Sequence, residues 1–136
     1  MSVFVDTSAF MTFLDDDDPR RGECRAAWEH GATEADGFVT TDYVFLETVS
    51  VAQRRWDLDA VRTLVDEFFP LVHVEPVTQD DRMAAVAALL AAGRRRLSLV
   101  DCASFTVMRR MRIRDYLGLD PHFEQQGFMP YRPAAD

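Results

Sequence analysis

Short apolar runs alternate with helical segments along the whole chain, and this alternation restricts the fold more than any other feature. The runs predict strands over residues 3–5, 38–40, 72–76 and 116–119, with an edge strand at 128–129. The segments between them predict helices over 9–14, 19–30, 42–55, 58–69, 79–92 and 99–111, with a short helix after Pro121. Strands separated by helices favour a parallel sheet covered on both faces. We therefore expect one α/β domain over residues 1–136, with three α/β/α layers, a mainly parallel sheet of four to five strands, and a loose tail after about residue 130.

The composition excludes several classes of function. The chain has 23 acidic and 15 basic residues, a net charge of −8, which argues against a general electrostatic grip on nucleic acid and leaves only local basic surfaces. Every basic residue is an arginine, so a phosphate-binding P-loop, which needs a lysine, is excluded. No apolar run approaches the roughly 18 residues of a membrane span, and no signal segment opens the sequence. Cys24 and Cys102 lie in apolar helical patterns and are expected to be core thiols, so we expect a cytoplasmic protein without membrane contact.

Four acidic residues lie among apolar residues, where a charged side chain is unusual. Asp6 ends the first predicted strand and Asp120 ends the fourth, while Glu47 and Asp101 lie among apolar residues of helices. Each has a structural explanation: Asp101 completes a capping box with Ser98, Glu47 pairs with an arginine such as Arg54 or Arg55, and Asp6 and Asp120 are turn acids. Taken together they favour a site, because the carboxyl ends of parallel strands meet at one edge of a sheet, where ligands bind.

Four carboxylates in one crevice need compensation. Two like charges about 5 Å apart repel by roughly 3 kcal/mol at an effective dielectric constant near 20, so such a site holds either protons or a hard cation. Oxygen ligands alone favour Mg²⁺, with Mn²⁺ as a substitute, over zinc. The three histidines, His30, His73 and His122, are scattered and are expected at the surface or in strands. An acidic Mg²⁺ site without a nucleotide loop indicates phosphodiester hydrolysis.

Three further motifs have both a structural and a functional interpretation. Thr7 and Ser8 follow the first acid, and one of them is expected to cap the next helix while the other orients the site. The acidic run 15–18 suits a helix start with Asp18 as N-cap, although a peripheral metal or substrate role stays open. Arg94, Arg95 and Arg96 precede the helix of Asp101 and are candidates for contacts to substrate phosphates, unless they are solvated helix-end residues.

The motifs around the four acids resemble those of the PIN domain family, and in particular the VapC-type toxin ribonucleases. The resemblance runs through Val5-Asp6-Thr7-Ser8-Ala9, Leu46-Glu47, Leu99-Val100-Asp101-Cys102-Ala103 and Asp120-Pro121-His122-Phe123, in order and over about residues 3–129. It implies Mg²⁺- or Mn²⁺-dependent endonucleolytic cleavage of RNA, with Asp6, Glu47, Asp101 and Asp120 as catalytic and metal-binding residues. It also implies an RNA substrate, a cognate antitoxin partner and a homodimer. The family often has a hydroxyl residue two positions before the last acid, where this chain has Gly118.

Three alternative functions share some of these sequence features. A PIN-like module that no longer cleaves, and instead binds RNA or protein, is the main alternative. A phosphotransfer receiver domain also has an acidic Mg²⁺ pocket but needs a lysine, and a flap-type DNA nuclease needs a longer helical insertion than this chain has room for. The early helices carry apolar residues that either form partner surfaces or belong to the core. These residues are Phe10, Phe13, Leu14, Trp28, Phe45 and Trp56.

Overall fold

A computed structural model describes residues 1–94 and 96–133, and its centre is one sheet of five parallel strands. The strands are β1 (Ser2–Val5), β2 (Gly37–Thr41), β3 (Val72–Glu75), β4 (Asp115–Leu117) and β5 (Met129–Pro130). Their spatial order is β3-β2-β1-β4-β5, and every pair is parallel. The predicted three-layer α/β/α architecture is confirmed, with strand boundaries shifted by one or two residues.

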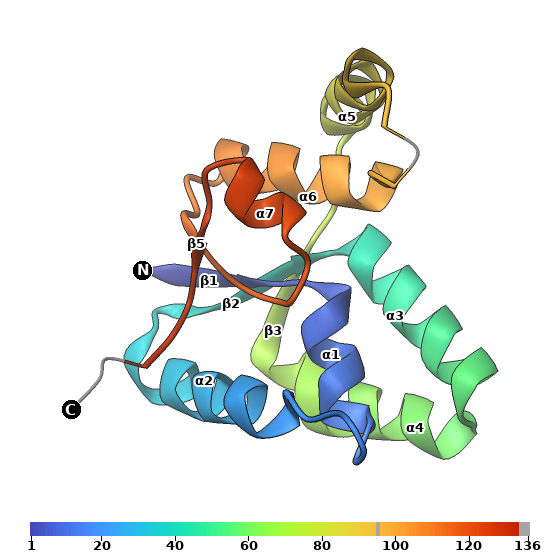
Figure 1. Cartoon of the computed structure of the whole chain (residues 1–136), viewed down its shortest axis with the longest axis vertical. Coiled ribbons are helices and arrows are strands. Elements are labelled where there is room, and N and C mark those ends of the chain that lie inside the picture. Colours follow the sequence, from blue (N-terminus) through green and yellow to red (C-terminus); the bar gives the residue numbers. More distant parts are fainter. Residues whose placement is uncertain (95, 134–136) are drawn as a thin grey trace.

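Seven helices surround the sheet in the part of the chain that the structure describes. They are α1 (Thr7–Leu14), α2 (Arg21–Glu34), α3 (Asp42–Arg55), α4 (Leu58–Thr63), α5 (Gln79–Ala92), α6 (Leu99–Arg110) and α7 (His122–Gln125). Figure 1 shows α1, α2 and α4 on one side of the sheet and α5, α6 and α7 on the other. The helix caps predicted at Thr41, Asp57, Thr78 and Ser98 are all present. None of the described helices has the length and apolar character that crossing a membrane requires.

Two helix predictions were wrong in their extent. The predicted helix 19–30 begins at Arg21, and its N-cap is Arg20 and not Asp18, whose carboxylate instead accepts the Arg20 N–H at 2.8 Å in the turn before the helix. The helix runs on to Glu34 because Gly31 is a packing residue and not a turn. A β-carbon at Gly31 would lie 2.9 Å from the ring of Phe38. The predicted helix 58–69 is α4, followed by a π-turn over Leu64–Phe68 and a 3₁₀ turn over Phe69–Leu71. Pro70 lies in that 3₁₀ turn, and its missing N–H makes a regular helix end there.

Aromatic side chains fill both faces of the sheet. Phe10, Phe13 and Trp28 are buried, and Trp28 stacks on Phe38 with 4.1 Å between ring centroids. The interpretation of these three residues as core is therefore confirmed, while Leu14, Phe45 and Trp56 are only partly buried at the edge of the core. Cys24 and Cys102 are buried free thiols, as expected.

The C-terminal segment is anchored as far as the structure describes it. Tyr131 is buried, and its hydroxyl lies 2.6 Å from Nδ1 of His30 on α2. The prediction of a loose tail after about residue 130 is therefore wrong for Tyr131, because an aromatic ring of this size finds apolar cover beside the sheet. Residues 134–136 lie outside the described part of the chain.

The strand order creates a switch point beside β1. The chain places β2 and β3 on one side of β1 and then crosses to the other side to form β4 and β5. Val5 is in register with Leu117, and the Asp6 N–H donates to the Leu117 carbonyl at 3.0 Å. Ligands of open α/β sheets bind outside the carboxyl ends of the strands at such a point. The last residues of β1 and β4 therefore deliver Asp6 and the loop of Asp120 to one place.

Candidate active site

A cleft of about 510 Å³ lies at the carboxyl edge of the sheet, and all four predicted acids line it. Its wall is completed by Thr7, Ser8, Met11, Thr12, Asp18, Arg20, Arg55, Ser98 and Leu119. A second hollow of about 560 Å³ lies between α2 and β4 and contains only Asp120 of the four acids. The convergence of carboxylates makes the first of these, the acidic cleft, the candidate active site.

Asp6 is fixed by the turn between β1 and α1. It is the N-cap of α1, and its Oδ2 accepts a hydrogen bond of 2.9 Å from the Ser8 hydroxyl. The same hydroxyl accepts the Leu119 N–H at 2.8 Å, which ties α1 to the loop after β4. The expectation that Thr7 or Ser8 caps this helix is therefore wrong, since the acid itself is the cap. Ser8 instead orients the carboxylate, and Thr7 lines the cleft beside it with a 3.5 Å contact to the Thr48 hydroxyl.

Gly118 has a spatial reason to be a glycine. A β-carbon at this position would lie 3.0 Å from the Asp6 β-carbon and 3.1 Å from the Ser8 Oγ. Its backbone is not in the left-handed region, so close approach and not conformation requires the small residue. A hydroxyl expected from the resemblance at this position is absent, and Ser8 supplies a hydroxyl beside Asp6.

Asp101 has both of the roles that the sequence left open. It completes the capping box of α6, because its N–H donates to the Ser98 Oγ at 3.0 Å and its Oδ2 accepts the Ser98 N–H at 3.4 Å. The same side chain also lines the acidic cleft. A carboxylate held by its own helix start is already positioned before any ligand arrives.

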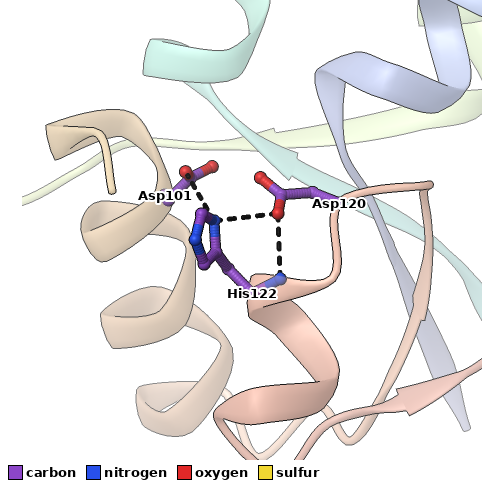
Figure 2. Close-up of side chains that lie close together, drawn as sticks. All are labelled: Asp101, Asp120 and His122. Carbon is purple, nitrogen blue, oxygen red and sulfur yellow. Dashed lines mark hydrogen bonds and ion pairs between the residues drawn. The ribbon is translucent and has the colours of Figure 1, made fainter. Parts of the chain in front are cut away.

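Asp120 forms a close group with Asp101 and with a residue that the sequence reasoning missed, His122. Figure 2 shows the His122 ring between the two carboxylates. Its Nδ1 lies 2.9 Å from Asp120 Oδ1 and 3.9 Å from Asp101 Oδ2. Neither approach has hydrogen-bond geometry, so this buried nitrogen has no hydrogen-bond partner among the described residues. The expectation of a surface or strand position was wrong for His122, because the turn at Pro121 folds its ring back over Asp120.

Glu47 lies on α3, half-buried, and lines the acidic cleft without joining the group around His122. Its expected pairing with Arg54 or Arg55 is not seen in residues 1–94 and 96–133. Arg55 instead donates to Asp15 at 2.8 Å. Glu47 therefore has no ion pair among the described residues that competes with a ligand in the cleft.

The buried acids of the cleft hold their protons more tightly than ordinary acids. Burial, with the nearby charge of Asp101 next in size, raises the pKa of Asp6 to about 7. Burial and the charge of Asp120 raise the pKa of Asp101 above its usual range. Ionising both carboxyls without a counter-charge is therefore costly, and a bound cation would remove this cost.

The donor set fits a divalent metal ion. Oxygen atoms of Asp101 and Asp120 and a ring nitrogen of His122 lie within 4.8 Å of one another. The unpartnered His122 nitrogen and the raised pKa values of two acids are what a metal site shows when no ion compensates it. His122 offers a nitrogen donor beside the oxygen ligands that the sequence predicts, and Mn²⁺ accepts such a donor more readily than Mg²⁺ does.

The arginines of the cleft are not those that the sequence singled out. Arg94 lies in a neighbouring hollow together with His122 and Gln126, Arg96 is exposed, and Arg95 lies outside the described residues. Their role toward substrate stays a prediction. Arg20 and Arg55 line the acidic cleft itself. No local sequence pattern predicts that these two arginines share a site, because Arg20 follows the acidic run and Arg55 ends a helix more than thirty residues later.

Comparison with known proteins identifies a family and relatives that this chain resembles over nearly its whole length. The profile of the PIN domain family matches residues 3–126. The chain is 32% identical over 132 residues to the 23S rRNA-specific endonuclease VapC20 of Mycobacterium tuberculosis, from strains CDC 1551 and H37Rv, covering 96% of this chain and 98% of each relative. The crystal structure of M. tuberculosis VapC20, described as a Sarcin-Ricin loop cleaving toxin, matches with a TM-score of 0.83 and 32% identity, covering 96% of this chain and 99% of that one.

Proposed function

The chain belongs to the PIN domain family, and from this premise we propose that it is a Mg²⁺-dependent endoribonuclease, with Mn²⁺ as a substitute, that acts as the toxin of a type II toxin–antitoxin pair. One observation carries the proposal: acids from β1, α3, α6 and the loop after β4 line a single cleft of about 510 Å³. The full-length similarity to a 23S rRNA-specific endonuclease supports RNA as the substrate. The first RNA to test is the sarcin–ricin loop, which the structural relative cleaves.

The residues of the acidic cleft would have two roles, holding the metal ion and orienting the residues that hold it. Asp6, Asp101 and Asp120 would hold the ion together with His122, and Glu47 would reach it directly or through water. A bound divalent ion supplies a water of lowered pKa and neutralises charge that develops on the phosphate. Ser8 keeps Asp6 turned into the cleft, and the Ser98 cap does the same for Asp101. Hydrolysis of this kind leaves a 5′-phosphate and a 3′-hydroxyl.

The partners follow from the same proposal. We propose a cognate antitoxin that covers the acidic cleft with a basic side chain, since four acids offer such a group a strong electrostatic site. A homodimer is the proposed assembly, as is usual for VapC-type toxins. A toxin that cleaves RNA meets its substrate in the cytoplasm, which is the proposed compartment.

The test compares wild-type protein with Asp101→Asn and Asp6→Asn on an end-labelled sarcin–ricin loop RNA and an unrelated RNA of equal length. Wild-type protein is expected to cut with Mg²⁺ or Mn²⁺ and to stop when a chelator is added. Each cleft variant is expected to lose at least about 100-fold in rate, because a metal-holding acid is removed. Asp66→Asn, which changes an exposed acid outside the cleft, is the matched control.

Two outcomes would contradict the proposal. Cleavage by both cleft variants at the wild-type rate would show that these acids do not hold the catalytic ion. Wild-type protein that binds RNA but leaves it intact with either metal would favour the alternative of a PIN-like binding module. Circular dichroism of each variant separates a loss of chemistry from a loss of fold.

A further inference from the structure

Two arginines form part of the acidic cleft, and both are held by the acidic run 15–18. Arg20 donates from Nε to Asp18 Oδ1 and from Nη2 to Asp18 Oδ2, each at 3.2 Å. Arg55, at the end of α3, donates from Nη2 to Asp15 Oδ2 at 2.8 Å and lies over the Trp56 ring at 4.6 Å. The acidic run, whose purpose the sequence left open, therefore fixes two guanidinium groups beside the cleft.

These guanidinium groups keep donors available for a ligand. Each guanidinium has five N–H donors, and the contacts to Asp15 and Asp18 use one donor of Arg55 and two of Arg20. The Arg20 side chain is 56% exposed and the Arg55 side chain is 54% exposed. A guanidinium that is already held in place loses less rotamer entropy when it binds. Its planar fork also matches two oxygens of a phosphate.

The charge of the molecule creates a need for such groups. With a net charge of −8 and four acids in the cleft, the protein repels RNA unless local cations meet its phosphates. Arg94 lies in another hollow. Among the described residues, Arg20 and Arg55 are the basic side chains that line the acidic cleft.

We propose that Arg20 and Arg55 bind backbone phosphates of the RNA that flank the scissile one, and that Asp18 and Asp15 position them. This inference rests on the proposed function, since it names how the same cleft holds its substrate. The contacts are to phosphate, so they add affinity that does not depend on the RNA sequence.

The test measures RNA affinity at several salt concentrations for Arg20→Gln, Arg55→Gln and the double variant. Every protein also carries Asp101→Asn so that the labelled RNA stays intact during fluorescence anisotropy. The matched control is Arg62→Gln, because Arg62 is 67% exposed and paired with Asp59 at 2.6 Å but lies on α4 outside the cleft. Arg20→Lys and Arg55→Lys keep the charge and check that a loss is not caused by misfolding.

Each glutamine variant is expected to lower the affinity about fivefold to tenfold, for the sarcin–ricin loop and for an unrelated RNA alike. The slope of log affinity against log salt is expected to fall by roughly 0.7 to 0.9 for each arginine removed. The lysine variants are expected to keep the slope and lose part of the affinity, and Arg62→Gln is expected to stay within about twofold of its parent.

A double variant whose affinity and slope equal those of Arg62→Gln would overturn this inference while leaving the nuclease proposal intact. Failure of the proposed function has a different signature, which is measured in protein without Asp101→Asn. That protein would not cleave RNA with either metal, and if it also failed to bind RNA, both proposals would fall. A loss of affinity confined to one RNA sequence would also contradict phosphate binding, because backbone contacts do not distinguish sequences.

Discussion

At the scale of single residues, the site depends on a carboxyl group that the protein makes hard to ionise. Asp6 is only 4% exposed, and its pKa is raised from 3.8 to about 7. The folded protein binds the Asp6 proton more tightly than the unfolded chain does, so between pH 3.8 and about pH 7 the folded protein carries more bound protons. The free energy of unfolding therefore falls as the pH rises from about 4 to about 7. Burial, which places Asp6 where a metal is needed, has a cost in stability when no metal is bound.

Asp6→Asn is expected to remove this cost. In a chelating buffer, the variant should melt at a higher temperature than wild-type protein at pH 8, and the difference should shrink toward pH 5, where Asp6 is protonated. The upper limit of the effect is roughly 4 kcal/mol, from about three pKa units at 1.36 kcal/mol each. Differential scanning calorimetry across the pH range measures it. Equal pH dependence in the variant and in wild-type protein would contradict the raised pKa.

Gly118→Ala tests the close approach beside Asp6. The added β-carbon would press on the Asp6 β-carbon and the Ser8 hydroxyl, so we expect RNA cleavage to fall about fivefold to tenfold, for roughly 1 kcal/mol of misplacement. Gly37→Ala is the control, because no atom lies within 4 Å of a β-carbon there. If both variants cleave at the wild-type rate, the spatial explanation of Gly118 is wrong.

At the scale of elements, the helix that carries Asp101 is braced by its neighbour. Asp81 completes the capping box of α5 with Thr78 and is buried. Its carboxylate also accepts hydrogen bonds from Arg110 of α6, at 3.0 Å from Nε and 2.8 Å from Nη2. Figure 1 shows α5 reaching away from the sheet with α6 between the two. This pair therefore joins the outermost helix to the helix of the active site.

Asp81→Ala is expected to lower the free energy of unfolding by about 2 to 3 kcal/mol, because it removes a cap and the charged partner of Arg110. Asp80→Ala removes an exposed acid from the same helical turn, so it should cost less than about 0.5 kcal/mol. Urea denaturation of the two variants gives the comparison. Equal losses would mean that the link between α5 and α6 contributes nothing beyond the charge of the helix start.

At the scale of the whole molecule, a metal ion in the acidic cleft would connect β1, α6 and the segment that leads into α7. These segments are far apart in the sequence and meet only at the switch point of the sheet. An ion that binds the folded state alone stabilises it by mass action. Binding also has to displace the protons that Asp6 and Asp101 hold, so the stabilisation should grow with pH.

Mn²⁺ at about 100 times its dissociation constant is expected to contribute roughly 2.7 kcal/mol, or about 10 °C in melting temperature. The shift should be larger at pH 8 than at pH 6 and should disappear when a chelator is added. Asp101→Asn should show a much smaller shift, while Asp66→Asn should behave as wild-type protein does. An Asp101→Asn shift as large as that of wild-type protein would place the ion elsewhere.

The sequence by itself determined the elements and the edge at which the four acids meet. Apolar runs, helix periodicity and the caps at Thr41, Thr78 and Ser98 depend on neighbours along the chain, so they can be recognised locally. Asp6, Glu47, Asp101 and Asp120 were predicted to share one edge because parallel strands end together, and all four line the acidic cleft.

Only the tertiary structure decided which other residues join these acids. His122 reaches Asp101, twenty-one positions earlier, across a turn whose direction depends on packing. Arg55 reaches Asp15 from the far end of α3. Gly31 and Gly118 are small because of side chains that approach from other elements. Such contacts join residues that are distant along the chain, so no local pattern contains them, and they form only when the layers pack around the sheet.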